Sequence, residues 1–441
     1  MDTAKKKVDS KHSIYAKNQP KRDLFRAVIG GTDTLREGGT KYLPKYPDEL
    51  DAEYQARLNA STIDGVVADG HQGLVGKVFH EAPDTSKVKI DQKILDNIDN
   101  EGNNFSVFTK RAFADAFDGH AIILVDSPKA EGPVASLEDE QNLGVRPYWR
   151  IYQAKDVINW RWDVDERKQT RLALLVLKEC PEVPDGDFGT KTIERYRVYR
   201  NQGVVTQELW EKVEGQAVGS EFVQVMDPMA MPKLTAIPAA IIGKLESEPW
   251  LLNESRLEIK AYQKESSFDI IEYLSIPVFY TVGYENEQPI SLGAHTHVRL
   301  NGENAQIGFA SIDSAGHTSL KATIDGIKQE IAGKLDAITK EAMPEGVGGD
   351  QTATEVVSDD SKSQARLIVW AQQLQDALNR ALQFTGQFMG MGEDNAGTVE
   401  LMTAWKVQKA KAEEAKKAAD ERAKAEVGKI NADAAGAGKN G

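Results

Sequence analysis

Residues 319–343 read SLKATIDGIKQEIAGKLDAITKEAM, and this stretch decides how the second half of the chain folds. The apolar residues return every three or four positions, at Leu320, Ile324, Ile327, Ile331, Leu335 and Ile338. That spacing puts them on one face of an α-helix and leaves the charged residues on the others. The sequence therefore predicts an amphipathic helix over residues 319–340 that packs its apolar face against another element.

A loose segment follows this helix. Residues 341–351 (EAMPEGVGGDQ) contain a proline and three glycines within four positions. Helix connections in compact domains usually take about 2–8 residues, and glycine permits many backbone conformations. We therefore expect a flexible loop with a role of its own; the alternative is a plain surface loop. Beyond it, Thr352 and Glu355 form a capping box that predicts the start of a long, bent helix over 352–390.

The elements before residue 319 complete an ordered series. Residues 251–277 have apolar residues at helical spacing, and Pro277 ends the pattern. Residues 278–318 alternate apolar with polar positions and are punctuated by glycine and proline, which is typical of a small β-rich insertion. The second half is thus predicted as helix, β-rich insertion, helix, loop and long helix.

The first half mixes helices with a sheet. Helical spacing covers about residues 48–80 and then 105–117, where Gly119 stops it. The apolar run HAIILVDSP (120–128) indicates a buried strand, and RYRVYR with VVTQELWEKV indicates a hairpin across NQG. Residues 27–250 are therefore predicted as a mixed α/β unit with a largely antiparallel sheet, which makes the chain α+β.

The two ends differ from the rest in composition. Residues 1–26 are basic and polar, so we expect a flexible arm, either a solvated tail or a docking segment. Residues 391–428 become rich in Ala, Lys and Glu with opposite charges four positions apart, which predicts a solvated helix. Residues 429–441 are predicted to be a disordered tail.

Bulk composition limits the function classes. The net charge of −14 argues against a protein that grips nucleic acid, because grip comes from cations on phosphates. It does not argue against a protein past which DNA slides, since an acidic wall repels phosphate. Cys180 is the single cysteine, which fits a reducing compartment such as a bacterial cytoplasm. We see no apolar run that would span a membrane and no secretory signal.

Motifs for enzymatic chemistry are weak. Residues 346–352 (GVGGDQT) lack the Lys-Ser/Thr of a phosphate-binding loop. His295 and His297 would share one side of a strand, as zinc ligands do, but no third ligand accompanies them. Asp163 and Asp165 suit magnesium but lie in a charged turn. We therefore predict no catalytic residues, no cofactor and no metal, and expect that the protein is not an enzyme.

The order of elements resembles that of the portal proteins of tailed bacteriophages. At finer grain the chain looks like a portal-like family long catalogued only as phage proteins of unknown function. The likeness covers roughly residues 42–390 and leaves out both ends. It is carried by YLPKYPDELDAEYQARLNAS, GLVGKVFHEAP, GHAIILVDSP, RPYWRIYQAKDVINWRW, LLNESRLEIKAYQKESSFDIIEYLSIPVFYTVGY and TATEVVSDDSKSQARLIVWAQQLQDALNRALQ.

The resemblance implies a portal-type subunit with a mixed α/β wing, a helical stem, a small β-rich clip, a bent tunnel helix and a helical crown. The implied parts are the wing at 27–250, the first stem helix at 251–277, the clip at 278–318, the second stem helix at 319–340, the tunnel loop at 341–351, the long bent tunnel/wing helix at 352–390 and the crown at 391–428.

The implied function is a dodecameric ring at one capsid vertex, through which double-stranded DNA is packaged and later ejected. The implied partners are other copies of the chain, the major capsid protein, the terminase large subunit and the head–tail connector or adaptor proteins. The expected location is the portal vertex of the virion, with the host bacterial cytoplasm during assembly.

Two sets of residues are candidates for the channel surface. The tunnel loop would touch DNA through Met343, Pro344 and Val347, and would repel phosphate through Glu345 and Asp350. On the second stem helix, four lysines either line the channel or form ion pairs between subunits. These are Lys321, Lys328, Lys334 and Lys340.

Two other functions stay open at this point. One is a different phage head–tail adaptor or minor capsid protein, although adaptors are usually shorter and lack this order of elements. The other is a metal-dependent DNA-processing enzyme such as a nuclease, which would use Asp163 and Asp165 or the histidine pair.

Overall fold

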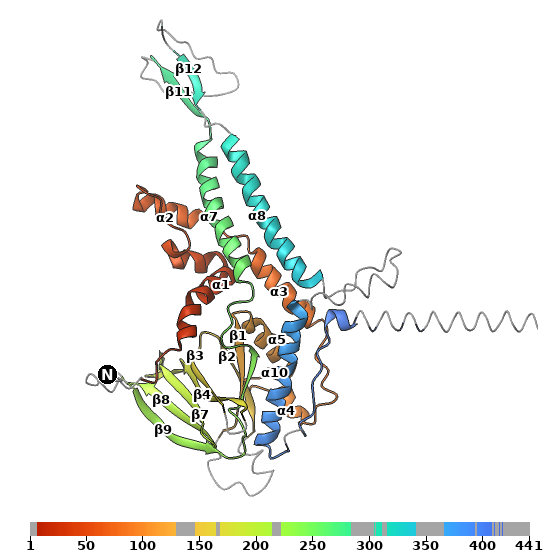
Figure 1. Cartoon of the computed structure of the whole chain (residues 1–441). Helices are drawn as coiled ribbons and strands as arrows, with labels where there is room; N and C mark the ends of the chain where they lie inside the picture. Colours follow the sequence, from red (N-terminus) through yellow and green to blue (C-terminus); the bar gives the residue numbers. More distant parts are fainter. Residues whose placement is uncertain are drawn as a thin grey trace, which may run out of the picture. The chain divides into compact units, whose positions relative to one another are not determined.

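The computed structural model divides the chain into two compact units (Figure 1). The first unit comprises Met1–Arg26, Asp69–Leu252 and Leu335–Gly441, and the second comprises Ala27–Ala68 and Asn253–Lys334. Helices and antiparallel sheets are mixed, so the fold class is α+β, as predicted. The described residues are 7–128, 146–164, 168–213, 222–283, 304, 306–310, 315–340, 366–392, 395–407, 410, 414 and 417.

A three-stranded sheet forms the centre of the first unit. Its order is β10 (Ala239–Gly243), β1 (His120–Asp126) and β2 (Tyr148–Gln153), all antiparallel. Every residue of β1 is buried, which confirms the strand predicted from the continuous apolar run. Gly119, at φ 115°, ends the preceding helix as expected.

A five-stranded antiparallel sheet carries the long hairpin strands. Its order is β3 (Val157–Val164), β4 (Thr170–Glu179), β7 (Arg195–Asn201), β8 (Val205–Lys212) and β9 (Phe222–Met231). Asn201 pairs with Val205, so the predicted hairpin across Asn201–Gly203 is confirmed. A small hairpin of β5 (Glu182–Asp185) and β6 (Gly189–Thr192) lies in the connection between β4 and β7.

Helices cover the three-stranded sheet. Both α5 (Phe105–Ala116) and α10 (Arg366–Phe388) pack against β1 and β10, and the short α4 (Gln92–Asp96) precedes α5. The buried Trp149 indole donates a hydrogen bond to Thr385 Oγ1 at 2.8 Å, which ties β2 to α10. Trp250 stacks on Trp370 with ring centroids 4.6 Å apart. These aromatic contacts fix α10 on the core.

The expectation of a flexible arm over residues 1–26 is wrong from Ser13 onward. Helix α1 (Ser13–Gly38) begins there, with a kink at Gly31. Arg22 is fully buried and donates to the carbonyl oxygens of Ala154 and Ser247 at 3.4 and 3.3 Å. Polar partners from distant parts of the chain therefore hold this segment, and a basic composition does not reveal them.

The second unit is built mainly of helices. It contains the end of α1, the 3₁₀ turn η1 (Gly39–Lys41), α2 (Asp51–Ala60), the start of α3 (Val66–Val78), α7 (Leu252–Leu274) and most of α8 (Ala315–Lys340). The single helical pattern expected over residues 48–80 is thus two helices. Residues 27–68 cluster with α7 and α8, although the sequence placed them in the wing.

The helix–insertion–helix order predicted for residues 251–340 is present. α7 ends at Leu274, before Pro277, and α8 begins at Ala315, four residues earlier than expected. Between them, β11 (Val278–Val282) and β12 (Gln306–Ala310) form a two-stranded antiparallel sheet. α7 and α8 run side by side, joined by the Phe268–His317 ring contact at 4.2 Å (Figure 1).

The remaining predictions concern the chain beyond α8. Residues 341–365 lie outside the described residues, so the tunnel loop and the start of the 352–390 helix stay predictions. The predicted C-terminal helix begins at Ala404, because Glu400 pairs with Asp84 and keeps this stretch extended. In the parts of the chain that the structure describes, no helix is both long and apolar enough to span a bilayer.

Candidate functional site

The two faces of α8 differ as the sequence predicted. Ile324, Ile327, Ile331, Leu335 and Ile338 are all buried, at 8% exposure or less. Leu320, the first member of the predicted stripe, is only half-buried. Three of the four candidate lysines have described side chains: Lys321 is exposed, whereas Lys328 and Lys334 are only partly exposed. Lys340 is the last residue of α8.

Lys328 is held by two carboxylates of its own chain. Its ammonium group contacts Asp64, in the α2–α3 connection, and Glu265 on α7. Burial lowers the pKa of Lys328, but the hydrogen bonds to Asp64 and Glu265 outweigh it, so the pKa is raised. Lys328 therefore joins three segments of the second unit, a role that neither of the two predicted ones included.

The other lysines are more accessible. Lys334 forms an ion pair with Glu330 at 2.7 Å, one turn away on α8, and both side chains are about half exposed. Lys321 lies on the exposed face near the start of the helix. Their assignment to a channel or to contacts between subunits stays a prediction. The loop candidates Met343, Pro344, Glu345, Val347 and Asp350 lie outside the described residues.

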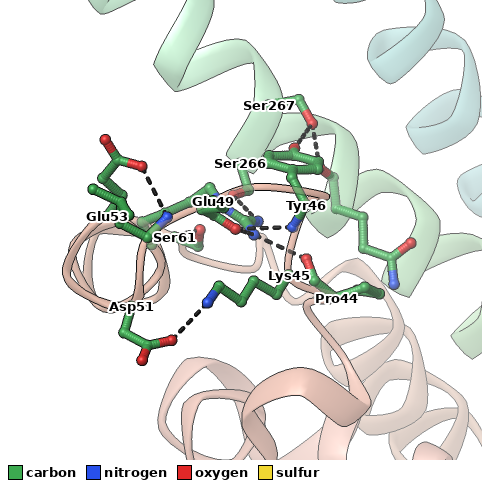
Figure 2. A network of polar contacts seen from close by, with 12 residues as sticks. Pro44, Lys45, Tyr46, Glu49, Asp51, Glu53, Ser61, Ser266 and Ser267 are labelled. Atoms are coloured by element: carbon green, nitrogen blue, oxygen red, sulfur yellow. Dashed lines mark hydrogen bonds and ion pairs between the residues drawn. The ribbon is translucent and has the colours of Figure 1, made fainter.

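A network of polar contacts holds the segment that precedes α2, with Glu49, Pro44 and Ser266 among its members (Figure 2). Arg57 makes a bidentate ion pair with Glu49, at 2.7 and 2.8 Å, and both side chains are almost fully buried. It also donates to the Pro44 carbonyl at 2.8 Å and to Ser266 Oγ on α7 at 3.3 Å. The Tyr46 ring lies 4.2 Å from the guanidinium carbon. Every bond of this network ties residues 44–57 to themselves or to α7.

The charges of this network stabilise each other. The hydrogen bond from Arg57 lowers the pKa of Glu49, against a smaller raising effect of burial. The same bond raises the pKa of Arg57. Sequence reasoning missed the pair although Glu49 and Arg57 are only eight positions apart, because Glu49 precedes α2 and helical spacing does not predict where it lies. The available signal is the cluster of Tyr, Pro, Asp, Glu and Arg in YPDELDAEYQAR, a stretch whose helical spacing by itself predicts only a helix start.

A second buried carboxylate sits at the start of α3. Glu258 on α7 is 2% exposed, and its Oε2 accepts the backbone N–H of Val67 at 2.9 Å. Burial raises the pKa of Glu258, while hydrogen bonds from the first amides of α3 oppose the rise. A carboxylate in this position favours the helix N-terminus. With Arg57 and Lys328, it fixes α7 against α2, α3 and α8 in the second unit.

The β11–β12 hairpin exposes apolar side chains on both faces. Val278, Tyr280 and Val282 alternate along β11 with exposures of 64%, 42% and 52%. Opposite in register, Phe279 contacts Phe309 with ring centroids 5.5 Å apart, and Phe309 is 62% exposed. An isolated two-stranded hairpin is marginally stable, and so much exposed apolar surface marks an interaction site. Among the described residues of the second unit, β11 and β12 carry five of the exposed large apolar side chains: Val278, Tyr280, Val282, Ile307 and Phe309.

Of the residues considered for metal chemistry, only Asp163 lies in the part of the chain that the structure describes. Asp163 forms an ion pair with Arg161 at 3.3 Å, and Asp165, His295 and His297 lie outside the described residues. Among the residues with a described placement, no three His, Cys, Asp or Glu side chains form a group that could hold a metal ion.

The comparisons with known proteins point to the same part of the chain. Residues 251–389 match a family model described as a domain of unknown function (DUF4055). The matched stretch opens at the start of α7, contains the hairpin and α8, and closes at the end of α10. No curated protein matches the sequence. One family model thus spans the helix–hairpin–helix segment and α10 together, without assigning them an activity.

Proposed function

We propose that this chain is a bacteriophage portal subunit, which assembles into a ring that forms the DNA channel at one capsid vertex. The observation that carries the proposal is the apolar β11–β12 hairpin at the end of the α7–α8 pair. An apolar surface on both faces of so small a sheet is stable when other protein covers it. In a ring, the neighbouring copies supply that cover.

The construction of the second unit supports this role. A helical stem, as proposed here, needs its two helices held firmly against each other and against the segments of the second unit beside them. Glu258, Arg57 and Lys328 each join α7 to another segment of the second unit, so the helix is held at more than one point along its length. Buried and charge-assisted contacts of this kind are more rigid than apolar packing alone.

The open face of α8 and the loop that follows it are the proposed channel surface. The loop carries an acidic residue on each side of its glycines, and the exposed face of α8 mixes lysines with Asp325 and Asp336. Such a mixed surface offers few strong phosphate sites, so a duplex slides instead of sticking. The proposed partners are DNA in the channel, the capsid protein around the ring, the terminase large subunit, and later the connector proteins.

The mass of the assembly tests the proposal. Native mass spectrometry of the purified full chain should give a closed oligomer of one or a few discrete sizes. Val278→Ser with Phe309→Ser should reduce that oligomer to small species, because polar side chains remove the apolar surface on both faces. Val164→Ser, at a 66% exposed valine of β3, is the matched control and should change nothing. A strictly monomeric wild-type chain, also in the presence of the capsid protein, would refute the proposal.

A further inference from the structure

The β5–β6 hairpin presents a bare aromatic side chain at its tip. Asp185 pairs with Gly189, which leaves Gly186, Asp187 and Phe188 as a three-residue turn. Phe188 is 103% exposed, so it packs against no other side chain in the described parts of the chain. Gly186 has φ 72°, and a Cβ on Gly189 would lie 2.5 Å from the Asp185 carbonyl oxygen. The glycines therefore set one turn geometry that holds Phe188 outward.

A groove of matching character lies on one face of the five-stranded sheet. It has a volume of about 740 Å³, within the usual range of ligand pockets. Its floor is formed by the buried Val176 and Val198, and half-buried Trp210 and Phe222 stand on one side.

The opposite wall of this groove is the segment before α1. Ser10 accepts a hydrogen bond from Asn159 at 2.9 Å, and the His12 backbone donates to the Ile158 carbonyl at the same distance. The His12 ring stacks on Trp160 with centroids 4.1 Å apart. The wall is therefore attached to β3 and leaves the groove open between itself and Trp210.

The charges of the two surfaces are opposite. The hairpin tip carries Asp185 and Asp187 beside Phe188. The groove is lined by Lys7, Arg161 and Arg200. Arg200 and the Trp210 indole N–H both donate to the buried Glu208, at 2.9 and 3.0 Å, which holds both side chains at the groove. Each arginine has five N–H donors, so donors remain for a carboxylate.

We infer that the hairpin tip of one copy, with Phe188 as anchor, docks in the Trp210 groove of a neighbouring copy. The inference rests on the proposed ring. The hairpin tip and the groove are different surfaces of one chain, so the contact between two copies is heterologous. When the rotation between successive copies closes, heterologous contacts generate a ring. The hairpin extends beyond the end of β4, away from the groove residues of its own β4 and β7, so it does not occupy the groove of its own chain.

Site-specific cross-linking tests the contact directly. In a Cys180→Ser background, Phe188→Cys and Leu174→Cys are placed in separate full-length chains, because Leu174 lines the groove. After mixing and mild oxidation, a disulfide-linked dimer should form in the mixture and not in either chain alone. Assembly without that cross-link would overturn the inference and leave the ring proposal standing.

Substitutions at the β5–β6 hairpin tip test the same contact through the strength of self-association. Phe188→Ser should weaken self-association about tenfold or more per interface in sedimentation equilibrium, because the phenyl burial is lost. Thr190→Ala on the same hairpin is the control and should leave it unchanged. Asp187→Lys and Arg161→Glu should each weaken association, and together they should restore it. Unaltered association in Phe188→Ser would overturn the inference, and a wild-type chain that never self-associates would overturn the ring as well.

Discussion

The Arg57 network offers the sharpest test of how the second unit is held. Arg57→Ala removes four hydrogen bonds, to Glu49, Pro44 and Ser266, and leaves the Glu49 carboxylate buried without its partner. Removing one member of a buried ion pair costs about 3–5 kcal/mol. The network lies near the surface of the unit, so we take the lower end, about 3 kcal/mol of local stability.

Hydrogen exchange measured by mass spectrometry reports the loss of local stability peptide by peptide. A loss of about 3 kcal/mol predicts roughly hundredfold faster exchange in peptides that cover α2. Tryptophan fluorescence should stay constant under the same conditions, because residues 27–68 and 253–334 contain no tryptophan. The pair Lys45–Asp51, only a few residues away and largely exposed, is the control, and Lys45→Ala should leave exchange unchanged.

A double-mutant cycle completes the test. Glu49→Ala with Arg57→Ala should lose less stability than the two single variants added together, by at least about 1 kcal/mol. The pKa of Glu49 is lowered in the folded protein, so the pair stabilises above the ordinary glutamate pKa and this contribution is lost as pH falls through the lowered value. Additive losses, or exchange of α2 that differs less than threefold from wild type, would refute the reasoning.

Three further predictions follow from other sites. Lys328→Met should destabilise the second unit by about 1–2 kcal/mol in hydrogen exchange, because Asp64 and Glu265 lose their shared cation, whereas Lys334→Met should change it by less than about 0.5 kcal/mol. Equal destabilisation by Lys328→Met and Lys334→Met would contradict this prediction. Burial raises the pKa of Asp118 to about 7, although the positive charges of Arg26 and Arg22 lower it. The folded protein therefore binds the carboxyl proton more tightly than the unfolded chain does, and the free energy of unfolding falls as pH rises from about 4 to 7. Asp118→Asn should remove up to about 4 kcal/mol of that pH dependence in urea titrations followed by tryptophan fluorescence, and an unchanged pH profile would show the prediction wrong. Deletion of residues 344–350 should leave assembly intact and impair DNA packaging or retention in a packaging assay, and normal packaging would end the proposed role of the loop.

Local sequence patterns predicted the elements whose stability is local. The stripe of α8, the apolar run of β1 and the turn at Asn201–Gly203 each contain their signal within a few residues, and each is found as predicted. Hydrophobic periodicity and turn chemistry depend on near neighbours, so they can be interpreted without knowledge of the rest of the fold.

Polar contacts between distant segments were not predictable in the same way. Ser266 lies 209 positions from Arg57, and Asp64 is still more remote from Lys328. Arg22 looks like a solvated cation in the sequence, yet its partners Ala154 and Ser247 bury it completely. A charged residue has the same local pattern whether it is solvated or buried with a partner, and only the fold distinguishes the two.

The most direct measurement of the central claim is an electron-microscopy class average of the purified full chain. The account predicts rings with radial spokes around a hole that admits a DNA duplex, with every subunit in the same environment. Compact particles without a hole, at concentrations where association is complete, would contradict it.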